Sequence, residues 1–244
     1  MFIASTVRRL RVCSKWSMST AAVFAWDRPG ALLVRRSNRA AHLQWVQQEA
    51  AAIVCGGPFW RDDGSTPSLP SSSSSSSSSP LGSFLIVQSD ALEFLQQDPY
   101  VQANLFQKRN VHPWRPAVGS LDRMPSDTVG VQPERRGQYH LVLGLDRPDA
   151  LPRRLKARAA HLAWLQASDS TCVIGGAIWR TPTEAPADAQ PVPYGSLLLV
   201  CGHATEADVR VWLRQDPYAH ANVFAAVEVF AFQPVIVRPV DQMR

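Results

Sequence analysis

The sequence has few cysteines, and none of them is placed for a disulfide framework or a zinc site. The four are Cys13, Cys55, Cys172 and Cys201, and no two of them form a C-x-x-C pair. We therefore expect small buried thiols, and the sequence implies no metal and no organic cofactor. The chain also lacks a G-x-S-x-G turn, a P-loop and a G-x-G-x-x-G fingerprint, so nucleophilic hydrolysis and nucleotide binding have no support.

Long hydrophobic runs are absent as well. No apolar stretch approaches the roughly 20 residues that cross a bilayer, which predicts a soluble protein with no membrane partner. The formal net charge is +5, but residues 1–20 contribute four basic residues and no acid. Without them the balance is 21 basic against 20 acidic residues, so we expect no nucleic-acid partner.

Residues 1–20 contain hydroxyl side chains, scattered arginines and no carboxylate. This composition predicts a mitochondrial transit peptide and a matrix location, and the charges interrupt any secretory apolar core. The alternative is an ordinary N-terminal extension, with translation beginning at Met18.

One stretch of the sequence occurs twice in the chain, as an internal repeat. The windows 27–46 and 146–165 are identical at 12 of 20 positions, at a constant offset of 119. In each window an aspartate precedes a histidine by 15 positions: Asp27 precedes His42, and Asp146 precedes His161. The repeat predicts two domains, 21–116 and 137–244, joined by a linker at 117–136 rich in proline, glycine and charge.

Each copy alternates strand-like and helix-like segments in the order β-α-β-β-α-β, a ferredoxin-like unit of the α+β class. One face of such a sheet carries the helices and the other needs a cover, so we expect the copies to cover each other as an intramolecular pseudo-dimer. Pairing or domain swapping between chains remains an alternative.

In copy 1 we predict strands at 21–26, 53–60, 82–87 and 109–114. We also predict short helices at 30–36 and from 39 onward, with Ser37 or Asn38 as N-cap of the second, and a longer helix at 90–97. An insertion at 65–80 carries an uninterrupted run, Ser71 to Ser79, which predicts disorder.

Both copies resemble the YCII-related (YciI-like) family of the dimeric α/β-barrel class. The residues that carry the resemblance are D-R-P-(G/D)-A-L, the A-A-H-L-x-W helix, a G-G strand followed by a G-S strand, and D-P-Y. The resemblance implies two tandem YCII-type domains forming a dimeric α/β barrel. It implies a small-molecule enzyme whose active site is a histidine–aspartate pair, with ring-opened or phenolic substrates known for a few relatives.

Carried over by position, the resemblance points to Asp27 with His42 and to Asp146 with His161 as catalytic pairs. The secondary substrate-binding candidates are Ser83, Asp98, Ser196 and Asp216. A histidine held by a carboxylate is suited to general-base chemistry near neutral pH, such as proton abstraction next to a carbonyl or elimination from a ring. If residues 30–42 formed one straight helix, His42 would lie about 18 Å along it from Gly30, and contact with Asp27 would fail.

Two functions follow as hypotheses. The first is a YCII-type acid–base enzyme of lyase or isomerase type, acting on a small carbonyl-bearing or aromatic-derived molecule. The second is a non-catalytic binding or assembly module in a mitochondrial protein complex, in which the histidines are ordinary helix residues and the aspartates form turns.

Overall fold

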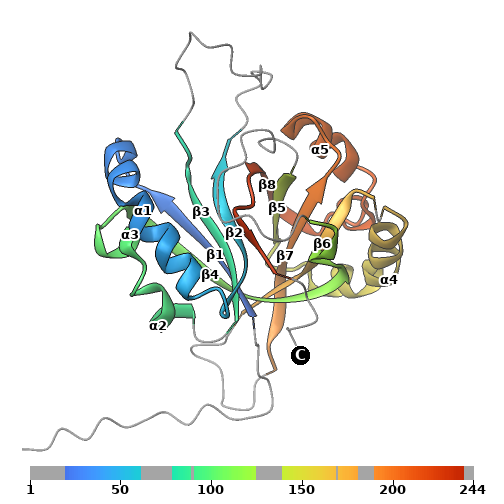
Figure 1. Cartoon of the computed structure of the whole chain (residues 1–244). Coiled ribbons are helices and arrows are strands. Elements are labelled where there is room, and N and C mark those ends of the chain that lie inside the picture. Colours follow the sequence, from blue (N-terminus) through green and yellow to red (C-terminus); the bar gives the residue numbers. More distant parts are fainter. Residues whose placement is uncertain are drawn as a thin grey trace, which may run out of the picture.

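The computed structural model describes residues 20–61, 79–88, 91–124, 139–168, 170–180 and 190–238. Nearly all of the predicted leader and of the serine tract, and most of the predicted linker, lie outside these ranges. In Figure 1 the strands occupy the centre of the molecule, with α1 to α3 on one side and α4 and α5 on the opposite side. The two copies therefore carry their helices on opposite outer faces.

Copy 1 has the predicted ferredoxin-like order of elements. Its sheet is antiparallel, with strands in the order β2-β3-β1-β4. The elements are β1 (Thr20–Asp27), α1 (Leu32–Gln48), β2 (Ile53–Trp60), β3 (Gly82–Gln88), α2 (Ala91–Leu95), α3 (Pro99–Gln102) and β4 (Phe106–Gly119).

Copy 2 repeats this arrangement, and its strands follow the equivalent order β6-β7-β5-β8. A short 3₁₀ turn, η1 (Leu121–Arg123), follows β4. The elements of copy 2 are β5 (Tyr139–Asp146), α4 (Leu151–Ala167), β6 (Cys172–Arg180), β7 (Val192–Cys201), α5 (Glu206–Leu213), α6 (Pro217–His220), β8 (Phe224–Phe232) and β9 (Ile236–Val237).

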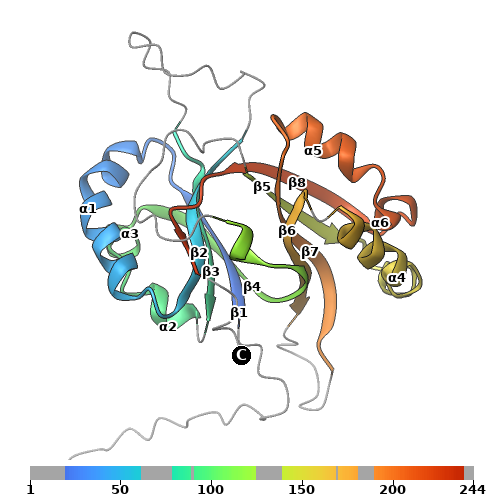
Figure 2. The same ribbon diagram turned by 45° about the vertical axis from the view of Figure 1, so that its right-hand side comes forward.

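The last strand of each copy passes from its own sheet to the sheet of the other copy. β4 pairs with β1 through Pro113 and with β6 from Trp114 onward. β8 pairs with β5, and its end, together with β9, pairs with β2. These two crossings close eight strands into a barrel, which Figure 2 shows from a second direction. The copies thus form the expected pseudo-dimer within one chain, and the closure leaves the barrel strands without an open edge.

The barrel interior is a shared apolar core. Rings of copy 1 contact rings of copy 2 directly: Phe59 and Phe230 lie 5.2 Å apart, and Phe84 and Phe232 lie 5.5 Å apart, between centroids. All four side chains are at most 1% exposed. Edge contacts of this kind add about 0.5–1.5 kcal/mol each to the burial of the rings, so the core stabilises the pairing of the two copies.

The expected break in the first helix is absent. α1 runs without interruption from Leu32 to Gln48, and its N-cap position is Ala31. The Ser37 hydroxyl donates back to the carbonyl of Leu33, 3.0 Å away, so it is satisfied inside the helix instead of capping a new one. The helix predicted at 90–97 is shorter in the structure, where α2 covers Ala91–Leu95, and a separate helix, α3, starts at Pro99. The strand predicted at 109–114 extends from Phe106 to Gly119, into the stretch expected to be linker.

The glycine pair of each copy lies where the crossing strand of the other copy passes. A Cβ on Gly57 would stand 1.9 Å from the carbonyl oxygen of Gln233. A Cβ on Gly176 would stand 1.9 Å from the carbonyl oxygen of Arg115. Because both obstacles are backbone atoms, no side-chain rotation relieves the clash. The second glycine of each G-G pair is therefore a requirement of barrel closure.

We predict that Gly57→Ala destabilises the protein by about 2–3 kcal/mol, because the added methyl group displaces the crossing strand. The free energy of unfolding from chemical denaturation measures the effect. Pro58→Ala is the control, since it introduces at the neighbouring position the residue that copy 2 carries as Ala177. An unchanged stability of Gly57→Ala would show that the strands do not cross this closely.

A polar contact inside the barrel also joins the copies. Nδ1 of His112, on β4, hydrogen-bonds with the hydroxyl of Tyr194, on β7. Nε2 of His112 is buried without a hydrogen-bond partner among the described residues. Burial, with a smaller contribution from the charge of Lys108, lowers the pKa of His112 from 6.5 to about 4. The native barrel therefore favours neutral His112.

We predict that this histidine makes the protein less stable in acid. Between pH 6.5 and about 4 the unfolded chain binds a proton at His112 that the native chain does not, so stability falls as the pH falls. The loss attributable to His112 is of order 2–3 kcal/mol. His112→Phe, which introduces the residue of copy 2 at this position (Phe230), should remove that part of the loss. Equal pH dependence of the two proteins in denaturant titrations would contradict this account.

Candidate functional site

The start of α1 is tied to the sheet by an ion pair. Arg35 Nε donates to Asp27 Oδ2 and Arg35 Nη2 donates to Asp27 Oδ1, both at 2.6 Å. Nη2 also donates to the Ser83 hydroxyl at 3.0 Å. The side chains of Arg35 and Asp27 are each 10% exposed. This Asp–Arg–Ser chain connects β1, α1 and β3, and it occupies both oxygens of Asp27.

A second polar cluster lies further along the same helix. Nδ1 of His42 is 2.8 Å from Oδ1 of Asp98, and the same oxygen accepts the backbone N–H of Tyr100 at 2.8 Å. Because a carboxylate only accepts, Nδ1 carries the proton and donates it to Asp98, which leaves the lone pair on Nε2. The imidazole stacks on the Tyr100 ring at 3.9 Å between centroids. Asp98 thus caps α3 and orients His42 at once.

The prediction that Asp27 is the partner of His42 is wrong. Asp27 binds Arg35 and His42 binds Asp98, and in copy 2 Asp146 binds Arg154 and His161 binds Asp216. The reason is the continuous helix: α1 carries His42 two turns beyond Arg35, away from the start of the helix where Asp27 lies. The aspartates of D-P-Y, predicted only as secondary lining residues, are the carboxylates in contact with the histidines.

Copy 2 repeats both clusters. His161 Nδ1 lies 2.7 Å from Asp216 Oδ1, and the imidazole stacks on Tyr218 at 3.8 Å. Arg154 donates to both oxygens of Asp146 and, at 2.8 Å, to the Ser196 hydroxyl. All eight residues predicted for the two sites therefore belong to these clusters, although in pairs that differ from the expected ones.

Burial shifts the pKa of acidic groups in both clusters. It raises the pKa of Tyr100 and of Tyr218, so these phenols stay neutral hydroxyl donors. Burial also raises the pKa of Asp146, and the charge and hydrogen bonds of Arg154 oppose that effect. The phenol under each histidine is thus a donor with no charge of its own.

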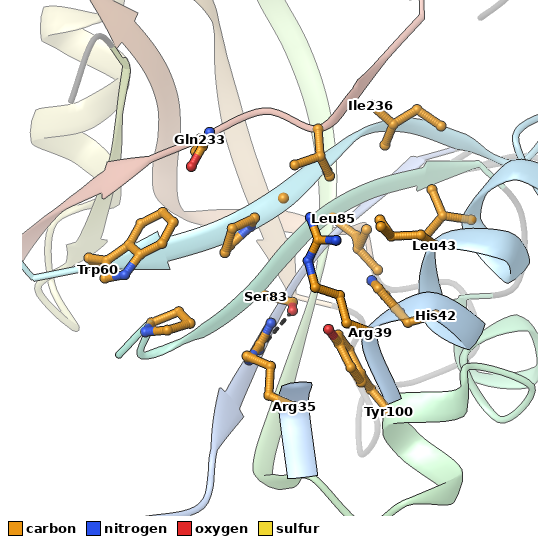
Figure 3. A pocket seen from close by; sticks show the side chains of 16 residues that line it. Arg35, Arg39, His42, Leu43, Trp60, Ser83, Leu85, Tyr100, Gln233 and Ile236 are labelled. Carbon is orange, nitrogen blue, oxygen red and sulfur yellow. Dashed lines mark hydrogen bonds between the residues drawn. The ribbon is translucent and has the colours of Figure 1, made fainter. Parts of the chain in front are cut away.

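A cavity of about 170 Å³ lies between α1 and the outer face of the sheet in copy 1. Figure 3 shows its lining side chains, with the Tyr100 hydroxyl turned into the cavity and Arg39 extending from α1 toward the strands. His42 lies at its edge, and with Nδ1 engaged by Asp98, Nε2 is the nitrogen available to a ligand. One wall comes from copy 2, through Gln233, Val235 and Ile236.

The corresponding region of copy 2 is more closed. The cavity beside His161 measures about 40 Å³ and is bounded by β5, β7 and β8 of the same copy. No residue of the crossing strand β4 lines it. α4 instead contacts β4 directly. The two histidine sites therefore share their polar geometry but differ in the space beside them.

Sequence reasoning missed several lining positions, among them Tyr100, which recurs as Tyr218 in the repeated D-P-Y segment. Arg35 and its counterpart Arg154 are identical at the offset of 119, a signal inside the repeated window. Arg39 and Arg158 are identical in the same way. Gln233 carried no such signal, because its counterpart is Arg115 and it belongs to the other half of the chain.

The described residues contain no group of three or more His, Cys, Asp or Glu side chains arranged to hold a metal ion. Within the same part of the chain, no helix has the length and apolar character needed to cross a membrane. The cavity lining consists of apolar side chains with arginines, a histidine, hydroxyls and an amide.

Two ferredoxin-like copies closed into one barrel, with helices outside, define a dimeric α/β-barrel protein. The family model of the YCII-related domain matches residues 20–115 and 139–233. The chain therefore belongs to the YCII-related family and contains two tandem copies of its domain.

The chain is also similar to several solved structures. The Burkholderia phenoliruptrix 5-chloro-2-hydroxyhydroquinone dehydrochlorinase, in complex with 2,5-dihydroxybenzoquinone, is 30% identical; the match covers 40% of this chain and 95% of that chain, with a TM-score of 0.32. A candidate monooxygenase from Fusobacterium nucleatum is 6% identical over 90% of this chain and 94% of its own, with a TM-score of 0.51. Chlorite dismutase from Candidatus Nitrospira defluvii is 10% identical over 92% and 93%, with a TM-score of 0.48. No curated protein matches significantly.

We predict that Asp27→Ala destabilises the fold by about 3 kcal/mol or more, because it leaves the buried Arg35 guanidinium without its carboxylate. Asp149→Ala is the matched control. It removes an aspartate that also pairs with an arginine, Arg153, at the surface, and it should leave the unfolding midpoint unchanged. Equal effects of the two substitutions would show that the Asp27–Arg35 pair contributes no more than a surface pair.

Proposed function

We propose that this YCII-related protein is a small-molecule enzyme that performs acid–base chemistry in the copy-1 cavity, with His42 as the general base. The observation that carries the proposal is a histidine fixed by a buried carboxylate at the edge of a cavity of about 170 Å³. The proposed substrate is a small carbonyl-bearing or aromatic-derived molecule, and the reaction is of isomerase or lyase type.

Asp98 prepares His42 for this role. By accepting the Nδ1 proton it fixes the tautomer that leaves a lone pair on Nε2, and it stabilises the imidazolium formed when Nε2 takes a proton. The N–H of Tyr100 holds the carboxylate in place, and the Tyr100 ring holds the imidazole plane. Asp98 is thus a positioning residue, whereas His42 touches the substrate.

Another lining group suits the charge that develops on the substrate. When Nε2 removes a proton from carbon next to a carbonyl, the C–H electron pair forms a carbon–carbon double bond and the carbonyl oxygen becomes an oxyanion. The neutral Tyr100 hydroxyl is a donor facing that space. Return of the proton to another carbon isomerises the substrate; loss of a leaving group from the neighbouring carbon completes an elimination.

The proposal assigns the chemistry to copy 1. Copy 2 has the same histidine–aspartate pair but only about 40 Å³ beside it, bounded differently. Its contribution is structural, because Gln233, Val235 and Ile236 complete the wall of the copy-1 cavity. The second hypothesis from the sequence was a binding role without turnover. The following experiment is designed to distinguish that role from catalysis.

The test is hydrogen–deuterium exchange at carbon, followed by proton NMR for a panel of small cyclic ketones and oxo-acids in D₂O. A general base in the cavity should catalyse exchange next to a carbonyl even when no net reaction follows. We predict that His42→Gln lowers the exchange rate by about 10²–10⁴-fold, the usual contribution of general-base catalysis. Asp98→Asn should cause a smaller loss, since it keeps the shape and removes only the charge.

His161→Gln is the matched control, because it makes the same change at the equivalent position of copy 2. It should leave the exchange rate unchanged. Equal losses in the two variants would contradict the assignment to copy 1. Exchange that persists in His42→Gln, or is absent for the whole panel with the unaltered chain, would favour binding without catalysis.

A further inference from the structure

The lining of the copy-1 cavity carries positive charge without negative charge. Its lining includes the guanidinium groups of Arg35 and Arg39 and no aspartate or glutamate. Arg35 is already neutralised, because its Nε and Nη2 donate to Asp27. Arg39 forms no ion pair with any residue in the described part of the chain. One positive charge over the cavity therefore has no counter-charge among the residues that the structure describes.

The position of Arg39 gives this charge a role in binding. The residue is exposed, and its side chain extends from α1 over the cavity toward the strands (Figure 3). It stands on α1 one turn after Arg35 and about one turn before His42, so its charge lies between the buried ion pair and the base. An exposed cation at the entrance to a pocket with low-dielectric walls concentrates anions there.

The remaining lining limits the size and polarity of the ligand. An apolar protein cavity of about 150 Å³ holds one benzene ring, and this cavity has about 170 Å³. The rest of the lining is mostly apolar, with Leu85, Pro58 and Ile236 among its residues. Buried Gln233 supplies an amide at the boundary with copy 2. The space therefore fits one ring or a short chain of similar volume, with a single charged end.

We propose that the ligand of this site is a small organic carboxylate of about one ring in size, with its carboxylate held by Arg39 and its apolar body against the strands. This inference rests on the proposed function for the location of the site and goes beyond it in the class of ligand. The planar guanidinium matches a carboxylate through two parallel N–H donors, which a neutral amide or alcohol cannot reproduce. With the carboxylate at Arg39, the rest of the molecule lies within the cavity that His42 borders.

Copy 2 provides the control within the same chain. Arg158 is the counterpart of Arg39 on α4, and it is also exposed. It lines no part of the smaller cavity beside His161. Two surface arginines at equivalent positions thus differ in whether a cavity lies beneath them.

The experiment is equilibrium binding of benzoate and of its neutral analogue benzamide to the full chain, by titration calorimetry. Benzoate should bind, and benzamide should bind at least about tenfold more weakly. Arg39→Gln should weaken benzoate about tenfold without changing benzamide, Arg39→Lys should lose less, and Arg158→Gln should change neither. Added salt should weaken benzoate selectively, since the contact is exposed.

The inference is overturned if benzoate does not bind, if benzamide binds equally well, or if Arg39→Gln and Arg158→Gln behave alike. Thermal unfolding of each variant confirms that it is folded, which is expected because both arginines are exposed. The result is separable from the proposed chemistry through His42→Gln. That variant should bind benzoate within a few-fold of the unaltered chain while losing exchange activity, so anion binding and catalysis can fail independently.

Discussion

The close passage of backbone over backbone at Gly57 and Gly176 is the constraint on which the rest of the structure depends. β4 and the β8–β9 segment each leave one sheet and join the other, and they pass within reach of Gly176 and Gly57 only because those positions carry no side chain. The crossing closes the barrel, removes the sheet edges and merges two apolar faces into one interior. It also brings residues of copy 2 to the wall of the cavity in copy 1.

The buried polar clusters have a second function in this arrangement. Helices on the outside of a barrel could pack in several registers against an aliphatic surface. The Asp–Arg–Ser chain fixes the start of each long helix, and the His–Asp–Tyr cluster fixes its later turns to α3 or α6. Buried charged groups of this kind are satisfied in only one geometry. The same contacts that hold α1 in register therefore present His42 at the edge of the cavity.

Much of this could be predicted from the sequence. Strand positions, the tandem organisation and the pairing of the copies followed from hydrophobic pattern and from the repeat. The partner of His42 did not, because a spacing of 15 residues does not say whether the intervening helix is continuous, and Ser37 reads as a cap when it in fact bonds back into the helix. The identity of Arg35 and Arg154 in the repeat was a usable signal for the true partner of Asp27. Gln233 and the His112–Tyr194 contact depend on where distant strands cross, which no local pattern encodes.

The unequal counterparts Gln233 and Arg115 have a consequence for how such a barrel can change. In a barrel made of two identical subunits, one substitution in the crossing strand alters both sites at once. In a single chain with two copies, the two crossing strands are separate segments, so a substitution in one of them leaves the other unchanged. Gln233 is buried and lines the copy-1 cavity, whereas Arg115 is exposed and lies outside the lining of the copy-2 cavity, so the two positions already differ. The covalent link between the copies thereby releases each site from the symmetry that the shared barrel would otherwise impose.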